Sequence, residues 1–212
     1  MQPELKPHLT AEEYLALERQ AETKSEYWNG QVYALAGASH EHTIVAANTI
    51  SLLVTQLRER PCTVHGSDMR VKVQEAGLYT YPDIVVVCGR AQFEDTRRDT
   101  LLSPTVLIEV LSRSTEGYDR GAKFQAYRTL GSLSDYLLIA QDQPVIEHYG
   151  RQPDDRWLLS AYQGLDAIVQ VASIGCSLPL TDVFDKVEFP EVEEWPGVIR
   201  RVKDGQIEYR RS

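Results

Sequence analysis

The stretch LIEVLSRSTEGYDRGAKFQAYR, residues 107–128, joins a strand-like run to a helical pattern and places charged residues in both. It opens with an apolar run typical of a buried strand, but Glu109 interrupts that run. A polar loop follows, and apolar residues then recur at helical spacing, with Lys123 among them. An unpaired buried carboxylate costs several kcal/mol, so a strand tolerates one where it meets a metal ion, a cation or several hydrogen-bond donors. The stretch therefore predicts a strand and a helix that meet at a polar site.

The segments around this stretch predict an α/β fold with a mixed central sheet flanked by helices. Thr10 and Glu13 form a capping box for a short helix, and Asn29-Gly30 marks a hairpin turn. The expected elements are a helix at 10–19, a hairpin at 25–36, a helix at 39–60, strands at 63–73, 82–88 and 105–111 with a turn at 77–80, a helix at 117–130 and a strand at 135–140. Further strands at 145–149, 156–162 and 168–171 are expected to extend the sheet.

The charge pattern divides the chain into a main domain and a short appendage. Residues 1–185 carry the elements above and predict a single domain. Residues 186–212 form a charged tail with a second hairpin signal at Asp204-Gly205. A charged tail of this kind is typical of a solvated surface hairpin or an oligomer arm.

Composition predicts a soluble cytoplasmic protein. Of the 212 residues, 42% are hydrophobic and 25% are charged, as in ordinary globular proteins. No apolar run reaches the length of about 18 residues that a membrane span needs, and the N-terminus lacks the apolar core of a signal peptide. Cys62, Cys88 and Cys176 show no metal-ligand spacing, so we expect reduced thiols and no membrane partner.

The net charge argues against a protein that coats DNA without regard to sequence. Acidic residues outnumber basic ones, and the formal net charge is −9. Non-specific binding relies on Lys and Arg to displace counterions from phosphates. A metal-dependent enzyme stays compatible with this charge, because divalent cations neutralise part of it at the site itself.

Two strand carboxylates are candidate metal ligands. Asp83 precedes four apolar residues of one strand, and Glu109 lies within the next. If the strands are neighbours, the two carboxylates and a backbone carbonyl make an oxygen-rich site that suits Mg²⁺, with Mn²⁺ as a substitute. The alternative is that each acid belongs to a structural ion pair, for example with Arg70 or Lys72.

Lys123 is the candidate for a cation beside these acids. Its ammonium would stabilise charge on a transferring phosphoryl group or orient the attacking water. The alternative is an ordinary helix-surface ion pair, because Asp119 lies four residues earlier.

At this point several motifs together resemble a known family. The chain from about residue 10 to 184 contains TAEEYLALE, SEYWNGQVYAL, SDMRVKV, YPDIVVVCG, LIEVLSRSTEGYDRGAKFQAYRTLGSLSDYLLIAQ and CSLPLTDVF. This pattern resembles the widespread bacterial family of restriction-endonuclease-like proteins in the PD-(D/E)XK nuclease superfamily. The resemblance implies an αβββαβ core with extra C-terminal strands, and a DNA-cleaving enzyme that uses Mg²⁺.

The resemblance also implies a role for individual residues. Asp83 and Glu109 would bind the metal, and the carbonyl of Val110 would complete the site. The superfamily usually has its lysine two residues after the strand acid, where this chain has Leu111. In this family the lysine has moved to the following helix, which here means Lys123. Glu26 matches a further acidic position, with an exposed hairpin residue as the alternative.

Two functions from different classes follow. The first is a Mg²⁺-dependent endonuclease that hydrolyses phosphodiester bonds in DNA, with a homodimer as the expected form for cutting two strands. The second is a non-catalytic interaction module on a nuclease scaffold. The net charge of −9 favours this module, and a nuclease fold does not by itself guarantee nuclease activity. The sequence leaves the roles of His42 and Arg70 open.

Overall fold

A computed structural model describes residues 8–189, 202–203 and 206–207. Its centre is a six-stranded mixed sheet with the strand order β11-β10-β9-β8-β6-β3. These strands are β3 (Cys62–Gly66), β6 (Ile84–Cys88), β8 (Val106–Leu111), β9 (Asp135–Ala140), β10 (Val145–Arg151) and β11 (Trp157–Gln163). β8 and β9 are parallel, whereas the other neighbours are antiparallel. The predicted mixed α/β architecture is therefore confirmed.

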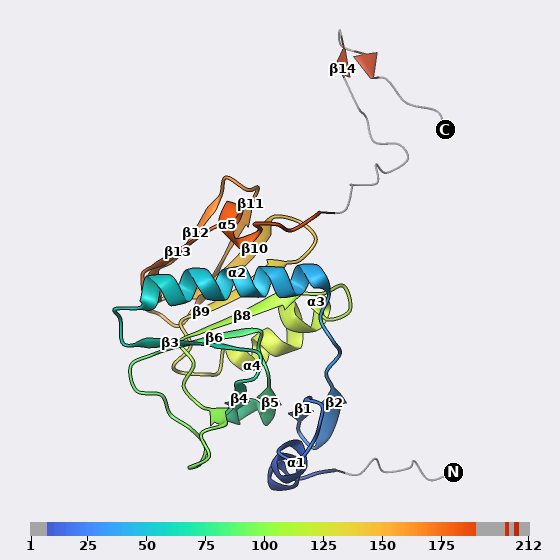
Figure 1. The fold of residues 1–212 in the computed structure, drawn as a ribbon, viewed down its shortest axis with the longest axis vertical. Helices are drawn as coiled ribbons and strands as arrows, with labels where there is room; N and C mark the ends of the chain where they lie inside the picture. Colours follow the sequence, from blue (N-terminus) through green and yellow to red (C-terminus); the bar gives the residue numbers. More distant parts are fainter. Residues whose placement is uncertain (1–7, 190–201, 204–205, 208–212) are drawn as a thin grey trace, which may run out of the picture.

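One face of the central sheet is covered by the long helix α2 (His40–Leu57), which crosses the sheet in Figure 1. Ser39 begins this helix, because its hydroxyl accepts a hydrogen bond from the backbone N–H of His42. The apolar side of α2 packs on alternate residues of β6, β8 and β9. The pair β12 (Ile168–Val171) and β13 (Cys176–Pro179) and the short helix α5 (Leu180–Val183) complete this layer.

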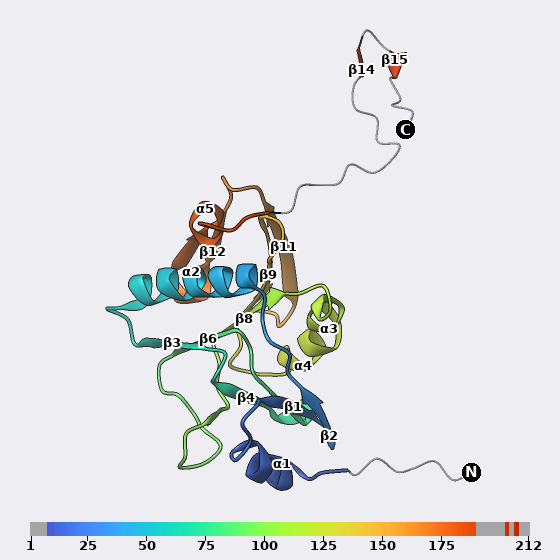
Figure 2. The ribbon, with the colours of Figure 1, turned by 45° about the vertical axis from the view of Figure 1, so that its right-hand side comes forward.

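The opposite face of the sheet packs on a helical segment and a second sheet (Figures 1 and 2). The segment consists of α3 (Glu116–Tyr118), a π-helical turn η2 (Asp119–Lys123) and α4 (Phe124–Tyr127). The second sheet has the order β2-β1-β5-β4-β7, built from β1 (Ser25–Trp28), β2 (Gln31–Ala34), β4 (Arg70–Val73), β5 (Leu78–Thr80) and β7 (Thr100–Leu101). Helix α1 (Ala11–Glu18) carries the predicted capping box and packs next to β1.

Three predicted strand assignments differ from the structure. The expected strand at 63–73 is divided between β3 and β4, which lie in different sheets, because the chain turns between Gly66 and Arg70. The expected turn at 77–80 is mostly strand β5, and the reversal occurs earlier, in a 3-10 turn at Gln74–Ala76 that ends at Gly77. β12 pairs with β13 and does not extend the central sheet.

The prediction of three reduced cysteines is wrong in the structure. Cys62 and Cys88 lie directly opposite each other on β3 and β6, and they form a disulfide. Their pairing follows from strand register across 26 residues of sequence, which no local spacing rule detects. Cys176 is free and buried.

The C-terminal appendage is described only at two short strands. β14 (Val202–Lys203) and β15 (Gln206–Ile207) pair antiparallel, as the predicted hairpin requires. The predicted turn at Asp204-Gly205 lies outside the described residues. Within the described part of the chain, no helix has the length and apolar character to cross a membrane.

Candidate active site

The two predicted strand acids lie opposite each other on adjacent strands of the central sheet. Asp83 lies immediately before β6, and Glu109 lies within β8. The antiparallel register of these strands places Ile84 opposite Ile108, so the next position along places Asp83 opposite Glu109. Directly opposite residues of an antiparallel pair share a face. Glu109 contacts the segment from α3 to α4, whereas Asp83, just before β6, contacts the start of α2.

Asp83 is held by one group on each of its oxygens. Its Oδ2 accepts a hydrogen bond of 2.7 Å from the backbone N–H of Val110. Its Oδ1 lies 3.0 Å from Nε2 of His42, which comes from the first turn of α2. Ser39 fixes that first turn by capping it. The start of α2 and the end of β8 thus orient the Asp83 carboxylate together.

The two oxygens of Glu109 are paired unequally. Oε1 accepts a 2.8 Å hydrogen bond from the Tyr127 hydroxyl and lies 3.0 Å from the Lys123 ammonium. Oε2 receives only a long contact of 3.4 Å from the backbone N–H of Asp83. Glu109 is 4% exposed, so this second oxygen is buried with little compensation.

Lys123 is the last residue of a π-helical turn. A π turn contains one more residue than an α turn, and such turns occur often at functional sites. Here Asp119 and Lys123 are both buried, and Nζ of Lys123 lies 3.5 Å from Oδ1 of Asp119. The predicted i,i+4 pair is therefore present, but it lies inside the site and not on the helix surface.

Glu26 joins the site from the second sheet. Oε1 of Glu26 lies 3.2 Å from Nζ of Lys123 and also accepts a hydrogen bond from the Thr80 hydroxyl. Tyr118 contacts its other oxygen at 3.4 Å. β1 pairs with β5, and this pairing brings Glu26 beside Thr80 although 54 residues separate them. Glu26 is 4% exposed, so it is not an exposed hairpin residue.

Burial and the surrounding charges shift the pKa values of the cluster. Burial raises the pKa of Glu109 to about 8, although the Lys123 ammonium lowers it in part. Burial also raises the pKa of Asp119. For Lys123 burial favours the neutral amine, but the carboxylates around it, Glu109 first, hold its pKa well above its usual value. Lys123 is therefore a charged ammonium in an acidic cluster.

Comparison with known families identifies the chain. The sequence model of the Uma2 family, described as "Putative restriction endonuclease", matches residues 11–181. This match covers most of the chain and includes every site residue named above. The chain belongs to the Uma2 family. The predicted restriction-endonuclease-like resemblance is thereby confirmed.

Two similar proteins are described as uncharacterized, and a solved structure confirms the fold. The uncharacterized protein sll1609 of Synechocystis sp. (strain PCC 6803) is 38% identical over 162 residues, 76% of this chain and 92% of that protein. The uncharacterized protein slr1290 of the same organism is 34% identical over 86% of this chain and 95% of its own length. A crystal structure described as a "putative nuclease" from Anabaena variabilis has a TM-score of 0.69 at 22% identity, covering 83% of this chain and 97% of the other.

The donor set of this Uma2 chain fits a hard divalent cation. Asp83 and Glu109 offer carboxylate oxygens from adjacent strands, and Oε2 of Glu109 is nearly unpaired. Mg²⁺ usually binds one or two carboxylates and keeps several waters. No group of three or more His, Cys, Asp or Glu side chains is arranged to hold a metal ion in the part of the chain that the structure describes, so any cation here would rely on two carboxylates, backbone oxygen and water.

Other residues named from the sequence lie elsewhere. Arg70 donates hydrogen bonds to Thr100 and Tyr81 and lies 3.3 Å from Asp99. Lys72 pairs with Glu94 at 2.6 Å. Neither residue compensates the two strand acids, so the alternative of a structural ion pair with Arg70 or Lys72 does not hold.

Sequence reasoning left parts of the site unassigned. His42 contacts Asp83 directly, and Tyr127 donates to Glu109. The spacing of Tyr127, one turn after Lys123, was a usable signal for the second contact. Thr80 and Tyr118 have no local sequence signal, because they reach Glu26 only through the packing of the second sheet.

Proposed function

We propose that this protein is a metal-dependent nuclease that hydrolyses phosphodiester bonds in DNA. The observation that carries the proposal is the 3.0 Å contact between Nζ of Lys123 and Oε1 of Glu109, with Asp83 opposite Glu109 in register. Two carboxylates and an ammonium in one buried cluster match the needs of phosphoryl transfer, which relies on positioning and charge stabilisation. Membership of the Uma2 family supports the reaction class.

Asp83 and Glu109 would hold Mg²⁺ or Mn²⁺, with the Val110 carbonyl as a further ligand. When bound, the metal ion would stabilise charge on the phosphoryl oxygens and lower the pKa of water. His42 and the Val110 N–H hold Asp83 in orientation, and the Tyr127 hydroxyl does so for Glu109. These contacts fix the acids before any substrate binds.

Lys123 would stabilise the charge that develops on the phosphoryl group as the bond breaks. Glu26 and Asp119 hold its ammonium in place from two sides. The substrate phosphate would replace part of this carboxylate contact as it enters. Removing one such donor from an active site costs roughly 10²–10³-fold in turnover.

A cleavage assay on duplex, single-stranded and branched DNA with Mg²⁺ or Mn²⁺ tests the proposal. Wild-type protein is expected to cut at least one of these substrates, and Lys123→Ala is expected to lose roughly 10²–10³-fold in rate. Lys72→Ala is the matched control, because Lys72 forms a lysine–glutamate pair of 2.6 Å outside the site. Absence of cleavage on all three substrates by folded wild-type protein would refute the nuclease.

A non-catalytic interaction module is the second candidate. The net charge of −9 and the nearly complete burial of Glu26, Glu109 and Lys123 favour it, because a closed ion cluster can be purely structural. This candidate predicts no cleavage and no response to metal. Location in the cytoplasm and a homodimeric state stay predictions, and sedimentation velocity of the full chain measures the second.

A further inference from the structure

A cavity of about 360 Å³ opens at the carboxyl ends of the parallel strands β8 and β9. Leu111, the last residue of β8, lines it and lies two positions after Glu109 on the same face. Two residues of a strand span roughly 7 Å, so the cavity begins about that far along the strand from the proposed metal ligand. Ligands of open α/β sheets commonly bind at this edge.

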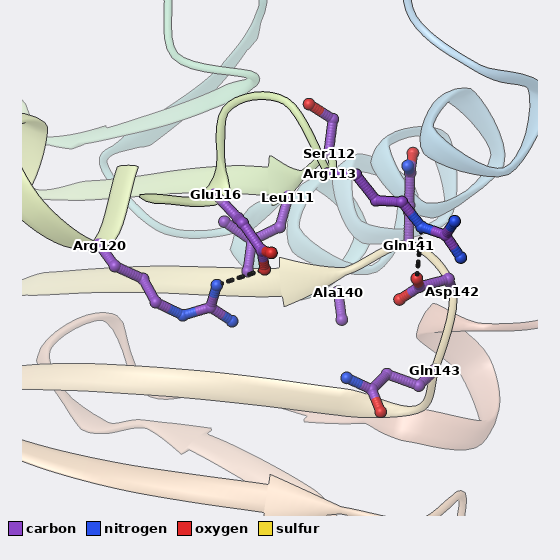
Figure 3. A pocket seen from close by; sticks show the side chains of 9 residues that line it. All are labelled: Leu111, Ser112, Arg113, Glu116, Arg120, Ala140, Gln141, Asp142 and Gln143. Carbon is purple, nitrogen blue, oxygen red and sulfur yellow. Dashed lines mark hydrogen bonds and ion pairs between the residues drawn. The ribbon is translucent and has the colours of Figure 1, made fainter. Parts of the chain in front are cut away.

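The lining of this cavity is polar and balanced in charge. It contains Arg113 and Arg120 together with Glu116 and Asp142, so its formal charge is zero. Arg120 is already paired, at 2.6 Å with Glu116 and at 3.0 Å with Glu147. Figure 3 shows Arg120 and Gln143 among the residues that line the cavity.

Arg113 differs from Arg120 in being weakly paired and open to solvent. Its side chain is 85% exposed, and it lies 3.7 Å from Asp142 (Figure 3). A contact of that length and exposure contributes little, so an incoming anion can replace it. Arg113 is therefore the group in this cavity that is available to a phosphate.

A second hollow continues the path toward the proposed active site. Its volume is about 430 Å³, and it shares Arg113, Gln141 and Asp142 with the first cavity. Its far side is formed by Ser39 and Glu41, at the start of α2. The next residue, His42, contacts Asp83. Arg113 therefore lies between the first cavity and the start of α2.

The size and the charge of the first cavity select the ligand. About 360 Å³ lies at the low end of small-molecule sites, roughly 300–1,000 Å³, and admits one nucleoside-sized group but no duplex. A charge-balanced cavity has no attraction for a polyanion, whereas side-chain amides and carboxylates hydrogen-bond to base edges. Gln141, Asp142 and Gln143 supply such groups.

We propose that this cavity is a subsite for one unpaired nucleotide of the strand to be cut, with the base inside and its phosphate at Arg113. The proposal rests on the nuclease function above and deepens it: the substrate is single-stranded DNA or a junction with an unpaired base. Gln143 contacts the base edge, and Arg113 contacts the backbone.

Fluorescence anisotropy tests the subsite. It measures how tightly the protein binds a labelled 12-nucleotide single strand and the matching duplex, with Ca²⁺ in place of Mg²⁺. Wild-type protein is expected to bind the single strand at least tenfold more tightly than the duplex. Arg113→Ala is expected to weaken single-strand binding about tenfold and to reduce the slope of log K against log salt by about 0.7, the value for one phosphate contact on a single strand. Gln143→Ala is expected to weaken binding without changing that slope.

Arg156→Ala is the matched control, because the Arg156 side chain is 83% exposed and also pairs with an aspartate, Asp154. It is expected to change binding less than twofold. Any of three results would overturn the subsite. The protein binds single strand and duplex equally, Arg113→Ala and Arg156→Ala have equal effects, or the protein binds neither DNA. Cleavage that is insensitive to Arg113→Ala would overturn the subsite alone. If single-strand binding depends on Arg113 but no DNA is cleaved, the subsite is supported and the proposed nuclease activity is rejected.

Discussion

At the scale of single residues, the site depends on one ammonium among three carboxylates. Nζ of Lys123 lies within 3.5 Å of Glu26, Glu109 and Asp119, and all four residues are buried. A buried ion pair contributes little net stability as a whole, but removal of one partner leaves the other charges uncompensated. Lys123 therefore stabilises the folded protein by compensating these buried carboxylates, separately from any catalytic role.

Replacing Lys123 tests this consequence. Lys123→Met keeps most of the volume and removes the charge, so we expect it to lower the free energy of unfolding by about 3–5 kcal/mol in EDTA. Urea denaturation measures the change. Lys24→Met is the control, because the Lys24–Asp68 pair is exposed and worth under about 1 kcal/mol. Equal effects of the two substitutions would contradict the buried cluster.

The pKa of Glu109 predicts how stability depends on pH. Burial raises this pKa from 4.5 to about 8, so the folded protein binds the proton more tightly than the unfolded chain does. The contribution of protonated Glu109 to the free energy of unfolding is fully present below pH 4.5 and is lost as the pH rises to about 8. In EDTA, the melting temperature of wild type should fall across that range more steeply than that of Glu109→Gln. Parallel curves for the two proteins would contradict the shift.

At the scale of elements, the π-helical turn sets the rotation of α3 relative to Lys123. The turn Asp119–Lys123 contains one residue more than an α turn, and both of its charged ends are buried in the site. Consecutive residues of an α-helix are about 100° apart around its axis. A regular α-helix anchored at Tyr127 would therefore set α3, which precedes the turn, at a different rotation.

Deletion of Gly121 tests this element. Removing one residue from the π turn should restore an α-helix and rotate Asp119 and α3 by about 100° around the helix axis relative to Lys123. We expect the deletion variant to keep its circular dichroism spectrum and to lose DNA cleavage about as far as Lys123→Ala. Gly121→Ala is the control, because an added Cβ meets nothing within 4 Å. Full cleavage by the deletion variant would show that the turn is not needed.

The disulfide between β3 and β6 has a measurable effect on stability. It closes a loop with a sequence separation of 26, for which loop-closure entropy predicts about 3.5 kcal/mol. Cys62→Ser combined with Cys88→Ser should lower the free energy of unfolding by roughly that amount under non-reducing conditions. Thiol titration of unfolded, unreduced protein should find one thiol per chain, that of Cys176. Three thiols would show that the bond does not form.

At the scale of the whole molecule, local periodicity predicted the central sheet and both of its helical layers. β9 has the predicted bounds, and β8 and α2 differ from prediction by a few residues, because each shows strong apolar periodicity. The convergence of Asp83 and Glu109 was also predictable, since it needs only that two successive strands be neighbours.

Long-range packing set the features that the sequence did not reveal. The second sheet assembles short strands from distant segments, and Glu26 enters the site only through it. The disulfide depends on the register of β3 against β6. The π turn differs from an α turn by a single residue, which apolar spacing over one turn does not resolve. The second sheet and the disulfide depend on contacts between residues far apart in the sequence. The π turn depends on a difference of one residue, which is less than the helical period that the apolar pattern reveals.

The central claim is that Asp83 and Glu109 hold one divalent cation beside Lys123. Electron paramagnetic resonance counts bound Mn²⁺ per chain in wild type, in Asp83→Asn and in the matched variant Asp135→Asn, whose carboxylate pairs with His148 at 2.6 Å outside the site. We predict one bound Mn²⁺ for wild type and Asp135→Asn, and none at the same concentration for Asp83→Asn. Equal Mn²⁺ binding by all three proteins, or no binding by wild type, would contradict the account.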